Sequence, residues 1–377
     1  MTTAPAEQDQ EQEKEDEKEK EEEKGQERAA GRRLCWIYPD RGTERMRTKE
    51  WTHVWGIYEE VARERGWALS LHQPEEVSVD ASAEGGPRVF LDGAAVTPQD
   101  TVFVTSLWSL AHHAPDVCNQ LYLYTILEAA GFYLPIPPRL SYIANDKTST
   151  MLHLAGSPLP QVPTVRIGAG RDSPTRTYEA ALSGLSYPLI VKPAYWGMGQ
   201  GVCLVRSAEE LKGVVGLAAG AETALVCQPY LGEGIEDFRV YVVDGKPHTV
   251  LRRIPQGAAL TANLSAGGGM QHVPLPPELA DAVDYVMARM PMPYIAVDFL
   301  HDGERFWLSE VEPDGAVAFP GSEQAAREQR QIIAARFDAY RDAHQEFLRR
   351  NREFPDRDQT LPNRNQAFPS RNQEQGR

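Results

Sequence analysis

This 377-residue chain lacks the cysteine patterns and the long apolar runs that define several classes of protein. Its four cysteines, Cys35, Cys118, Cys203 and Cys227, form no CxxC pair and no metal-ligand spacing, which argues against a disulfide framework or a zinc site. No run is long and apolar enough to cross a bilayer, and the start carries no apolar signal-peptide core. We therefore expect a reduced, cytoplasmic protein without a membrane partner.

An excess of basic residues is also missing. The formal net charge is −15, and residues 1–33, with twelve acids and seven bases, account for −5 of it, which leaves −10 on the rest. A negative chain of this kind is not expected to bind the phosphate backbone of a nucleic acid. Residues 1–33 also contain almost nothing apolar, so they are predicted to be a disordered acidic tail, with a charged single helix as the alternative.

After this tail the chain alternates between strand-like and helical patterns. "LCWIY" and "VFVTSL" read as strands, and residues 51–65 and a stretch ending at Gly131 read as helices, which predicts a parallel α/β layer at 34–140. Two further regions, 141–225 and 226–321, precede a closing helix at 322–354. Residues 355–377 repeat a seven-residue unit with a proline in each copy, which excludes a continuous helix and predicts a second disordered tail.

The stretch "LSEVEPDG", residues 308–315, places Glu310 and Glu312 two residues apart. In a strand, side chains two apart lie on the same face, so these carboxylates would be neighbours that repel each other unless a positive group lies between them. A hard cation such as Mg²⁺, which prefers carboxylate oxygens, would fill that role. A solvated strand face is the alternative reading.

A glycine loop, "WGMGQGVCLV", follows the apolar run "YPLIVKP". It leads into a strand and contains no Gly-Lys-Ser/Thr, so it is neither a dinucleotide-binding loop nor a P-loop. Such a loop between antiparallel strands suits phosphate binding through backbone N–H groups, although an ordinary glycine-rich hairpin is equally consistent. Lys192 in the apolar run strengthens the first reading, since a buried lysine needs a counter-charge.

With these motifs in view, the chain resembles the ATP-grasp superfamily, in particular its RimK-like and glutathione-synthetase-like ligases. The resemblance covers roughly residues 143–320 and consists of nine short motifs in the family's order: "NDK", "YPLIVKP", "WGMGQGV", "VCQPYL", "DFRVYVVDG", "RRIPQG", "NLSAGGG", "VDF" and "SEVEPDG". It implies an α/β protein with an ATP-grasp fold, in two α+β lobes, preceded by a Rossmann-like N-terminal domain.

The resemblance also implies roles for individual residues. The cofactors would be ATP and one or two Mg²⁺ ions, with Mn²⁺ as an alternative. The nucleotide would be bound through its phosphates, adenine and ribose by Lys147, Lys192, Gly197, Gly199, Gly201, Gln228, Pro229, Leu231 and Asp237. The metal would be held by Asp298, Glu310 and Glu312, and the acyl phosphate would be steadied by Arg253, Arg239 and Asn263. Ordinary strand-face charges are the alternative for the two arginines.

Two positions depart from the family pattern. Glu312 stands where the family usually has asparagine, which adds a negative charge to the metal site. Thr261 and Gly269 stand where glutathione synthetases place arginines that hold an acidic peptide, so a less acidic substrate is expected.

The implied activity is ATP-dependent formation of a peptide or amide bond between a small carboxylate and an amine, through an acyl phosphate. Natural-product or other small-molecule biosynthesis would be its setting. A carboxylate–thiol ligase that loads a carrier protein, an ATP-grasp kinase and a non-catalytic nucleotide-binding module are the alternatives. The sequence leaves the oligomeric state open, a homodimer included.

The three proposed metal ligands constrain the hairpin between "YIAVDFL" and "RFWLSEVEP". A regular two-residue Asp302–Gly303 turn would place Asp298 on the opposite face from Glu310, because opposed residues share a face. We therefore predict an odd-length connection or a bulge. A three-residue loop, Asp302–Glu304, would set Asp298 opposite Leu308.

Overall fold

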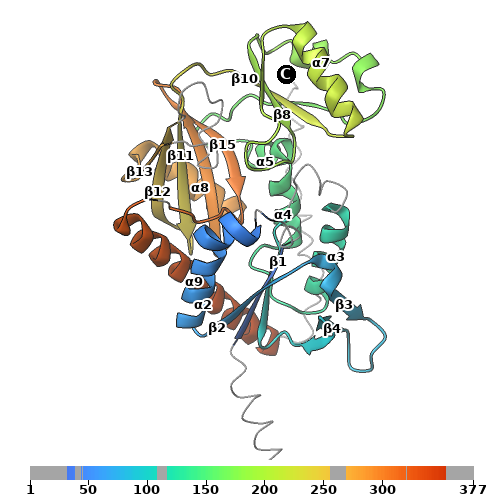
Figure 1. The fold of residues 1–377 in the computed structure, drawn as a ribbon, viewed down its shortest axis with the longest axis vertical. Coiled ribbons are helices and arrows are strands. Elements are labelled where there is room, and N and C mark those ends of the chain that lie inside the picture. Colours follow the sequence, from blue (N-terminus) through green and yellow to red (C-terminus); the bar gives the residue numbers. More distant parts are fainter. Residues whose placement is uncertain are drawn as a thin grey trace, which may run out of the picture.

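The computed structural model describes residues 32–38, 44, 46–107, 117–254, 269–319 and 321–353. Within them the chain forms four sheets and the helices that pack on them (Figure 1), so the mixed α/β class predicted from the sequence is confirmed. The predicted tails lie outside these residues, except that the first strand already begins at Arg32. None of the helices in this part of the chain combines the length and apolarity that crossing a bilayer requires.

The N-terminal region is built around a parallel three-stranded sheet. β1 (Arg32–Ile37) pairs with β2 (Trp67–His72) on one side and with β6 (Thr101–Val104) on the other, as the predicted parallel layer requires. The connection from β1 to β2 is η1 (Met46–Trp55), a π-helix, followed by α2 (Gly56–Glu64), in place of the single helix predicted for 51–65.

Of the other elements of this region, α3 (Val117–Ala129) corresponds to the helix predicted to end at Gly131, whereas the antiparallel strands were not predicted. A small antiparallel sheet packs beside the parallel one, and short helices link the region to the rest of the chain. These elements are η2 (Pro74–Glu76), β3 (Val77–Asp80), β4 (Arg88–Leu91), β5 (Ala94–Val96), α3 (Val117–Ala129), α4 (Pro138–Asn145) and α5 (Lys147–His153). The predicted boundary at residue 140 falls inside α4.

The central lobe is a four-stranded antiparallel sheet covered on one face by α7. Alternate side chains of its strands, such as Leu189, Val191 and Cys227, pack with α7 in a core of their own. Its elements are β7 (Val165–Ile167), η4 (Ser173–Thr175), α6 (Glu179–Leu182), β8 (Leu189–Pro193), β9 (Cys203–Val205), α7 (Ala208–Gly220) and β10 (Leu225–Pro229), in the sheet order β7-β10-β8-β9.

The position of β10 corrects the predicted lobe boundary at residue 225. The prediction assigned 226–321 to the C-terminal lobe, but β10 hydrogen-bonds to β8 and β7 and therefore belongs to the small sheet. The C-terminal lobe begins only with β11, at Glu236.

The C-terminal lobe is a five-stranded antiparallel sheet in the order β13-β12-β11-β14-β15. β11 and β12 are joined by a tight two-residue turn, in which Asp244 and Gly245 both have positive φ values, as the Asp-Gly dipeptide favours. The elements are β11 (Glu236–Val243), β12 (Lys246–Ile254), β13 (Gly269–His272), η6 (Pro277–Leu279), α8 (Ala280–Arg289), β14 (Tyr294–His301), β15 (Phe306–Glu312) and α9 (Glu323–Glu353).

The largest apolar core is shared between the two ends of the chain. It joins Leu34 and Trp36 of β1 and Tyr58 of α2 to the C-terminal sheet and to Phe337 of α9. Figure 1 shows α9 lying beside α2 along the side of the molecule where the N-terminal region meets the large sheet. The N-terminal region therefore does not have a core entirely of its own.

Candidate functional site

Three carboxylates meet on one face of the large sheet at the β14–β15 hairpin. Oxygen atoms of Asp298, Glu310 and Glu312 all lie within 4.8 Å of one another. The residues that connect the strands are 302–305, and Phe299 pairs with Leu308, but Asp298 pairs with Glu310. One extra residue, Ser309, is therefore bulged out.

The bulge confirms the predicted break in the hairpin, whereas the three-residue loop was wrong. The four-residue connection alone would set Asp298 opposite Ser309 and send Glu310 to the other face. The bulge restores the shared face directly beside the acids. Bulges of this kind leave no pattern in the sequence, so only the requirement that the three acids converge pointed to it.

Two buried arginines lie on the same face, on the next strands of the sheet. Arg239 of β11 donates two hydrogen bonds to Asp298, from Nε at 2.7 Å and Nη2 at 2.6 Å, and its Nη2 lies 2.9 Å from Glu312. Arg253 of β12 donates from Nη2 to Asp237 at 2.7 Å and to Asp298 at 3.0 Å. Both arginines thus compensate the negative charge of the acids. The same ion pairs hold the two guanidinium groups in place.

Lys147 joins this face to the central lobe. It is the first residue of α5, where Asp146 accepts hydrogen bonds from the amides of Thr148 and Ser149 and so begins the helix. Its Nζ lies 3.1 Å from Oε1 of Glu310 and donates to the backbone oxygen of Trp196, at the start of the glycine loop, at 2.9 Å. One ammonium group therefore contacts both the acids and the loop.

Lys192 lies on β8, on the face of the small sheet opposite to α7. Its neighbours Leu189 and Val191 are buried against α7, so Lys192 and Ile190 point the other way and are half-buried. No described residue forms an ion pair with Lys192. Burial and the charge of Lys147 lower the pKa of its ammonium group, although Glu310 acts in the opposite direction.

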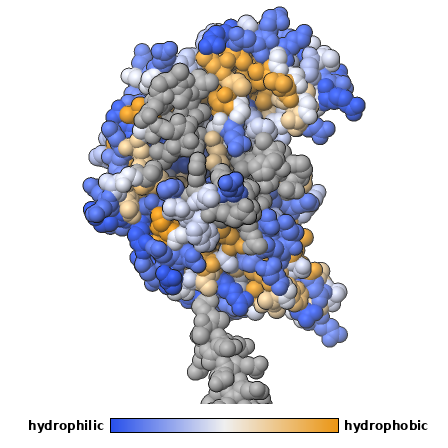
Figure 2. Space-filling view, viewed as in Figure 1, coloured by the Kyte–Doolittle hydropathy of each residue, from blue (hydrophilic) through white to orange (hydrophobic). Residues whose placement is uncertain are grey.

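The face that carries Lys192 is otherwise largely apolar. Val226 pairs with Lys192 across the sheet, and Gln228 and Leu204 both pair with Ile190. Figure 2 shows apolar surface gathered on this lobe, where β8 and β10 lie in Figure 1. Sequence reasoning missed the half-buried Ile190 and Leu204 as a platform, because apolar residues in a strand ordinarily indicate only a core.

The glycine loop has a backbone that other residues adopt poorly. Gly199 and Gly201 have φ values of +71° and +72°. At Gly201 an added Cβ would also come within 2.9 Å of the Pro193 ring. The loop between β8 and β9 therefore needs glycine at position 199 for its conformation and at position 201 for both conformation and space.

The segment predicted to contact adenine, residues 228–231, begins at the end of β10. The Gln228 side chain donates to Oγ1 of Thr164 at 2.8 Å and is buried. The Tyr230 amide donates to the oxygen of Pro188, which ties the segment to the start of β8. Within the part of the chain that the structure describes, the Leu231 amide has no hydrogen-bond acceptor.

The pKa values of the acids at this site are shifted in different directions. Burial acts to raise the pKa of Asp298, but Arg239 and Arg253 outweigh it and bring the value to about 2. Lys147 and Lys192 likewise outweigh burial at Glu310 and lower its pKa. At Asp237 and Glu312 burial prevails and raises the pKa. The site therefore combines two acids that stay charged, Asp298 and Glu310, with two that favour the protonated form, Asp237 and Glu312. A further cation would favour the charged form of all four.

Two buried polar atoms at this site lack a partner among the described residues. They are Oδ1 of Asp237 and Nε of Arg253. Buried polar atoms are normally hydrogen-bonded, so an unpaired acceptor and donor side by side suit a bound molecule that supplies both. Asn263, the remaining residue predicted for the site, lies outside the described residues.

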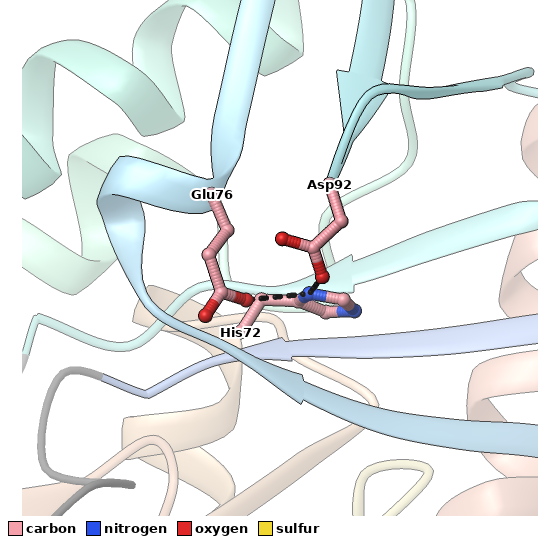
Figure 3. A group of neighbouring side chains, drawn as sticks. All are labelled: His72, Glu76 and Asp92. Carbon is pink, nitrogen blue, oxygen red and sulfur yellow. Dashed lines mark hydrogen bonds and ion pairs between the residues drawn. The ribbon is translucent and has the colours of Figure 1, made fainter.

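A second group of potential metal ligands lies in the N-terminal region (Figure 3). His72 Nδ1 is 3.1 Å from Glu76 and 3.9 Å from Asp92, and its Nε2 is 2.9 Å from the Ser70 hydroxyl. Both ring nitrogens thus have protein partners, and the Asp92 side chain is 64% exposed. No lysine or arginine accompanies this group in the contacts of the described residues, so it lacks the features that mark the site around Asp298.

Comparison with known proteins identifies the family. The RimK-like ATP-grasp domain family matches residues 144–334, which is half of the chain and includes β7 to β15 and the start of α9. The chain belongs to the RimK-like ATP-grasp family. The resemblance inferred from the nine motifs is thereby confirmed.

Individual relatives match only part of this ATP-grasp protein. A D-alanine–D-alanine ligase of Parasynechococcus marenigrum is 38% identical over 92 residues, 23% of this chain and 26% of the relative. An uncharacterized protein, MG011, of Mycoplasma genitalium is 30% identical over 128 residues, 34% of this chain and 44% of the relative. The chain thus spans less than half the length of these relatives.

Among solved structures, the ATP-grasp ligase PsnB, complexed with a minimal precursor, aligns with 82% of this chain and 99% of its own. The TM-score is 0.53 at 16% identity. At this level of identity the likeness concerns the fold alone. It extends beyond the family match into the N-terminal region, whose Rossmann-like character remains a prediction.

Proposed function

We propose that this ATP-grasp protein is an ATP-dependent ligase that joins a carboxylate to an amine. One observation carries the proposal: Lys147 of α5 and Lys192 of the central lobe converge with three carboxylates of the C-terminal lobe, and Lys147 pairs directly with Glu310. Carboxylates beside lysines and a glycine loop are what a magnesium-bound nucleotide triphosphate requires. The amide-forming name of the D-alanine–D-alanine ligase relative supports this choice of reaction.

The donor set fits the nucleotide and the metal. Asp298, Glu310 and Glu312 would hold Mg²⁺, or Mn²⁺ in its place, and Lys147 and Lys192 would contact phosphate oxygens together with the amides of Gly197, Gly199 and Gly201. The ion neutralises negative charge on the phosphates when bound. The unpaired Oδ1 of Asp237 would accept from a ribose hydroxyl.

The base would occupy the platform of Ile190 and Leu204, which are both partly exposed. The carbonyl of Pro229 and the free amide of Leu231 would then hydrogen-bond with the edge of adenine. Gln228 would act through the rigidity that its bond to Thr164 gives to this segment, because its amide is already committed.

The proposed reaction has two steps. A carboxylate oxygen of the substrate attacks the γ-phosphorus of ATP, so an acyl phosphate forms as ADP leaves. The amine then attacks the acyl carbon, the new C–N bond forms, inorganic phosphate leaves and the amine loses a proton. Arg253 and Arg239, held rigidly by Asp237 and Asp298, would present positive charge to the acyl phosphate. Asn263 would assist them.

A screen for ADP release tests the proposal. Amino acids and short peptides would be offered in pairs with MgATP, and products identified by mass spectrometry. ADP and phosphate in equal amounts with a condensed amide support the ligase. ADP without free phosphate and a phosphorylated alcohol would indicate a kinase, and a thioester on a carrier protein would indicate a carboxylate–thiol ligase. Absence of ATP binding would contradict every enzyme reading.

A further inference from the structure

The segment that follows the proposed metal ligands is held almost entirely by side chains. After Glu312 the chain makes a turn, in which the Gly315 amide donates to the Glu312 oxygen at 3.2 Å. The segment from 313 to 319 then runs on without belonging to a strand. Tyr241 donates to the oxygen of Ala316 at 3.1 Å, and Tyr58 accepts from the Val317 amide at 3.2 Å.

An ion pair between Asp314 and Arg336 connects this turn to the closing helix. The Arg336 side chain, in the middle of α9, has no exposed surface, and its Nη2 pairs with Oδ1 of Asp314. The other oxygen of Asp314 accepts from the Trp36 indole at 2.8 Å. One carboxylate two residues beyond Glu312 is thereby fixed both by the closing helix and by the first strand.

Aromatic rings enclose the Arg336 guanidinium. Its carbon lies 3.9 Å from the centre of the Tyr294 ring and 4.7 Å from that of Trp36. Nε donates to the hydroxyl of Tyr340 at 2.8 Å, and Nη1 donates to that of Tyr58 at 3.3 Å. Arginine favours such stacking, and a guanidinium held on several sides cannot follow movements of the turn.

We propose that Arg336 is a positioning residue for the metal site, which holds Glu312 in place through Asp314 and the turn at 313–315. This inference rests on the proposed function. A buried ion pair is weak as a source of stability, since apolar residues of similar volume often serve as well, but it can specify one arrangement. Here the arrangement specified is that of the strand end that bears Glu312.

Several residues around the Asp314–Arg336 pair lie outside the segment that the family matches. Arg336 and Tyr340 lie after the family match at 144–334, and Trp36 and Tyr58 lie before it. The N-terminal region and α9 thus contact the end of β15 through residues outside the matched segment. Removal of Arg336 is expected to loosen this end without touching the nucleotide platform on the small sheet.

Titration calorimetry with ADP and Mn²⁺ tests the proposal without requiring turnover. We expect Arg336→Met to weaken Mn²⁺ binding to the ADP complex about tenfold, while ADP binding without metal stays within twofold of wild type. Arg336→Lys, which keeps the charge, should recover part of the loss. Arg330→Met is the matched control, because Arg330 joins the same helix to Glu60 and Glu64 of α2 but does not contact the turn. Its metal affinity should be unchanged.

If Arg336→Met does not fold, Asp314→Asn replaces it, since asparagine retains hydrogen-bond acceptance but loses the charge. A smaller loss of Mn²⁺ affinity, three- to tenfold, is then expected. A folded variant with wild-type metal affinity would overturn the positioning role, as would an equal loss in Arg330→Met. A wild-type protein that binds neither ADP nor Mn²⁺ would instead overturn the proposed function itself.

Discussion

Replacement of Lys192 by methionine should separate stability from function. The ammonium group of Lys192 is half-buried and has no ion pair with a described residue, and burial and Lys147 lower its pKa. A lysine whose pKa is lower in the folded protein than in the unfolded chain destabilises the fold at every pH at which the unfolded chain carries the charge. This penalty grows as the pH falls through the unfolded-state pKa, and it disappears in Lys192→Met.

The surroundings of Lys192 set the expected changes in the free energy of unfolding and in nucleotide affinity. At neutral pH Lys192→Met should leave the free energy of unfolding unchanged or raise it by about 0.5–2 kcal/mol, the usual gain from relieving an unfavourable group. Nucleotide affinity should fall, because a hydrogen bond to a charged group contributes about 1.5–3 kcal/mol, or roughly ten- to hundredfold in Kd. The position would thus be kept for phosphate binding at the expense of stability.

Lys147→Met provides the contrast. Lys147 is buried and pairs with Glu310 and the Trp196 oxygen, so its loss leaves partly buried acceptors unpaired and should destabilise the protein by about 1–3 kcal/mol. Urea unfolding at pH 7.5 and calorimetry with MgADP measure the two quantities for each variant. The reasoning is refuted if Lys192→Met is less stable than wild type by more than about 1 kcal/mol, or if it binds MgADP normally.

Three further predictions concern the hairpin and the tails. In Gly315→Ala the new Cβ would lie 2.7 Å from that of Ala296, and this overpacking should lower the free energy of unfolding in urea by about 1–3 kcal/mol; an unchanged midpoint would contradict the close approach. Glu312→Asn removes one of the three carboxylates and should raise the Mg²⁺ concentration needed for half-maximal ADP release; a lowered requirement would argue against metal ligation. Deletion of residues 1–30 and 356–377, which are nearly devoid of apolar side chains, should leave kinetic constants for ADP release within twofold, and a large loss would assign substrate recruitment to a tail.

Much of the site could be predicted because it depends on residues that are close together in the sequence. The spacing of Glu310 and Glu312 places them on one face of any strand, and Asp244–Gly245 predicts its tight turn from backbone preference alone. The order of short motifs predicted the family. Such inferences need only a few neighbouring residues, and tertiary packing did not override them here.

The remaining features depend on contacts between distant segments. Whether Asp298 shares a face with the glutamates was decided by one bulged residue, Ser309, whose backbone is set by the pairing of two strands. Likewise β10 joined the small sheet because its edges pair with β7 and β8. Arg336 resembles any other charge in an Arg- and Gln-rich helix until the fold brings Asp314 and Trp36 to it. The sequence by itself determined which side chains could form this site, and only the tertiary structure decided which charges meet, since an ion pair between residues on separate elements, such as Lys147 and Glu310, has no periodicity by which a sequence could reveal it.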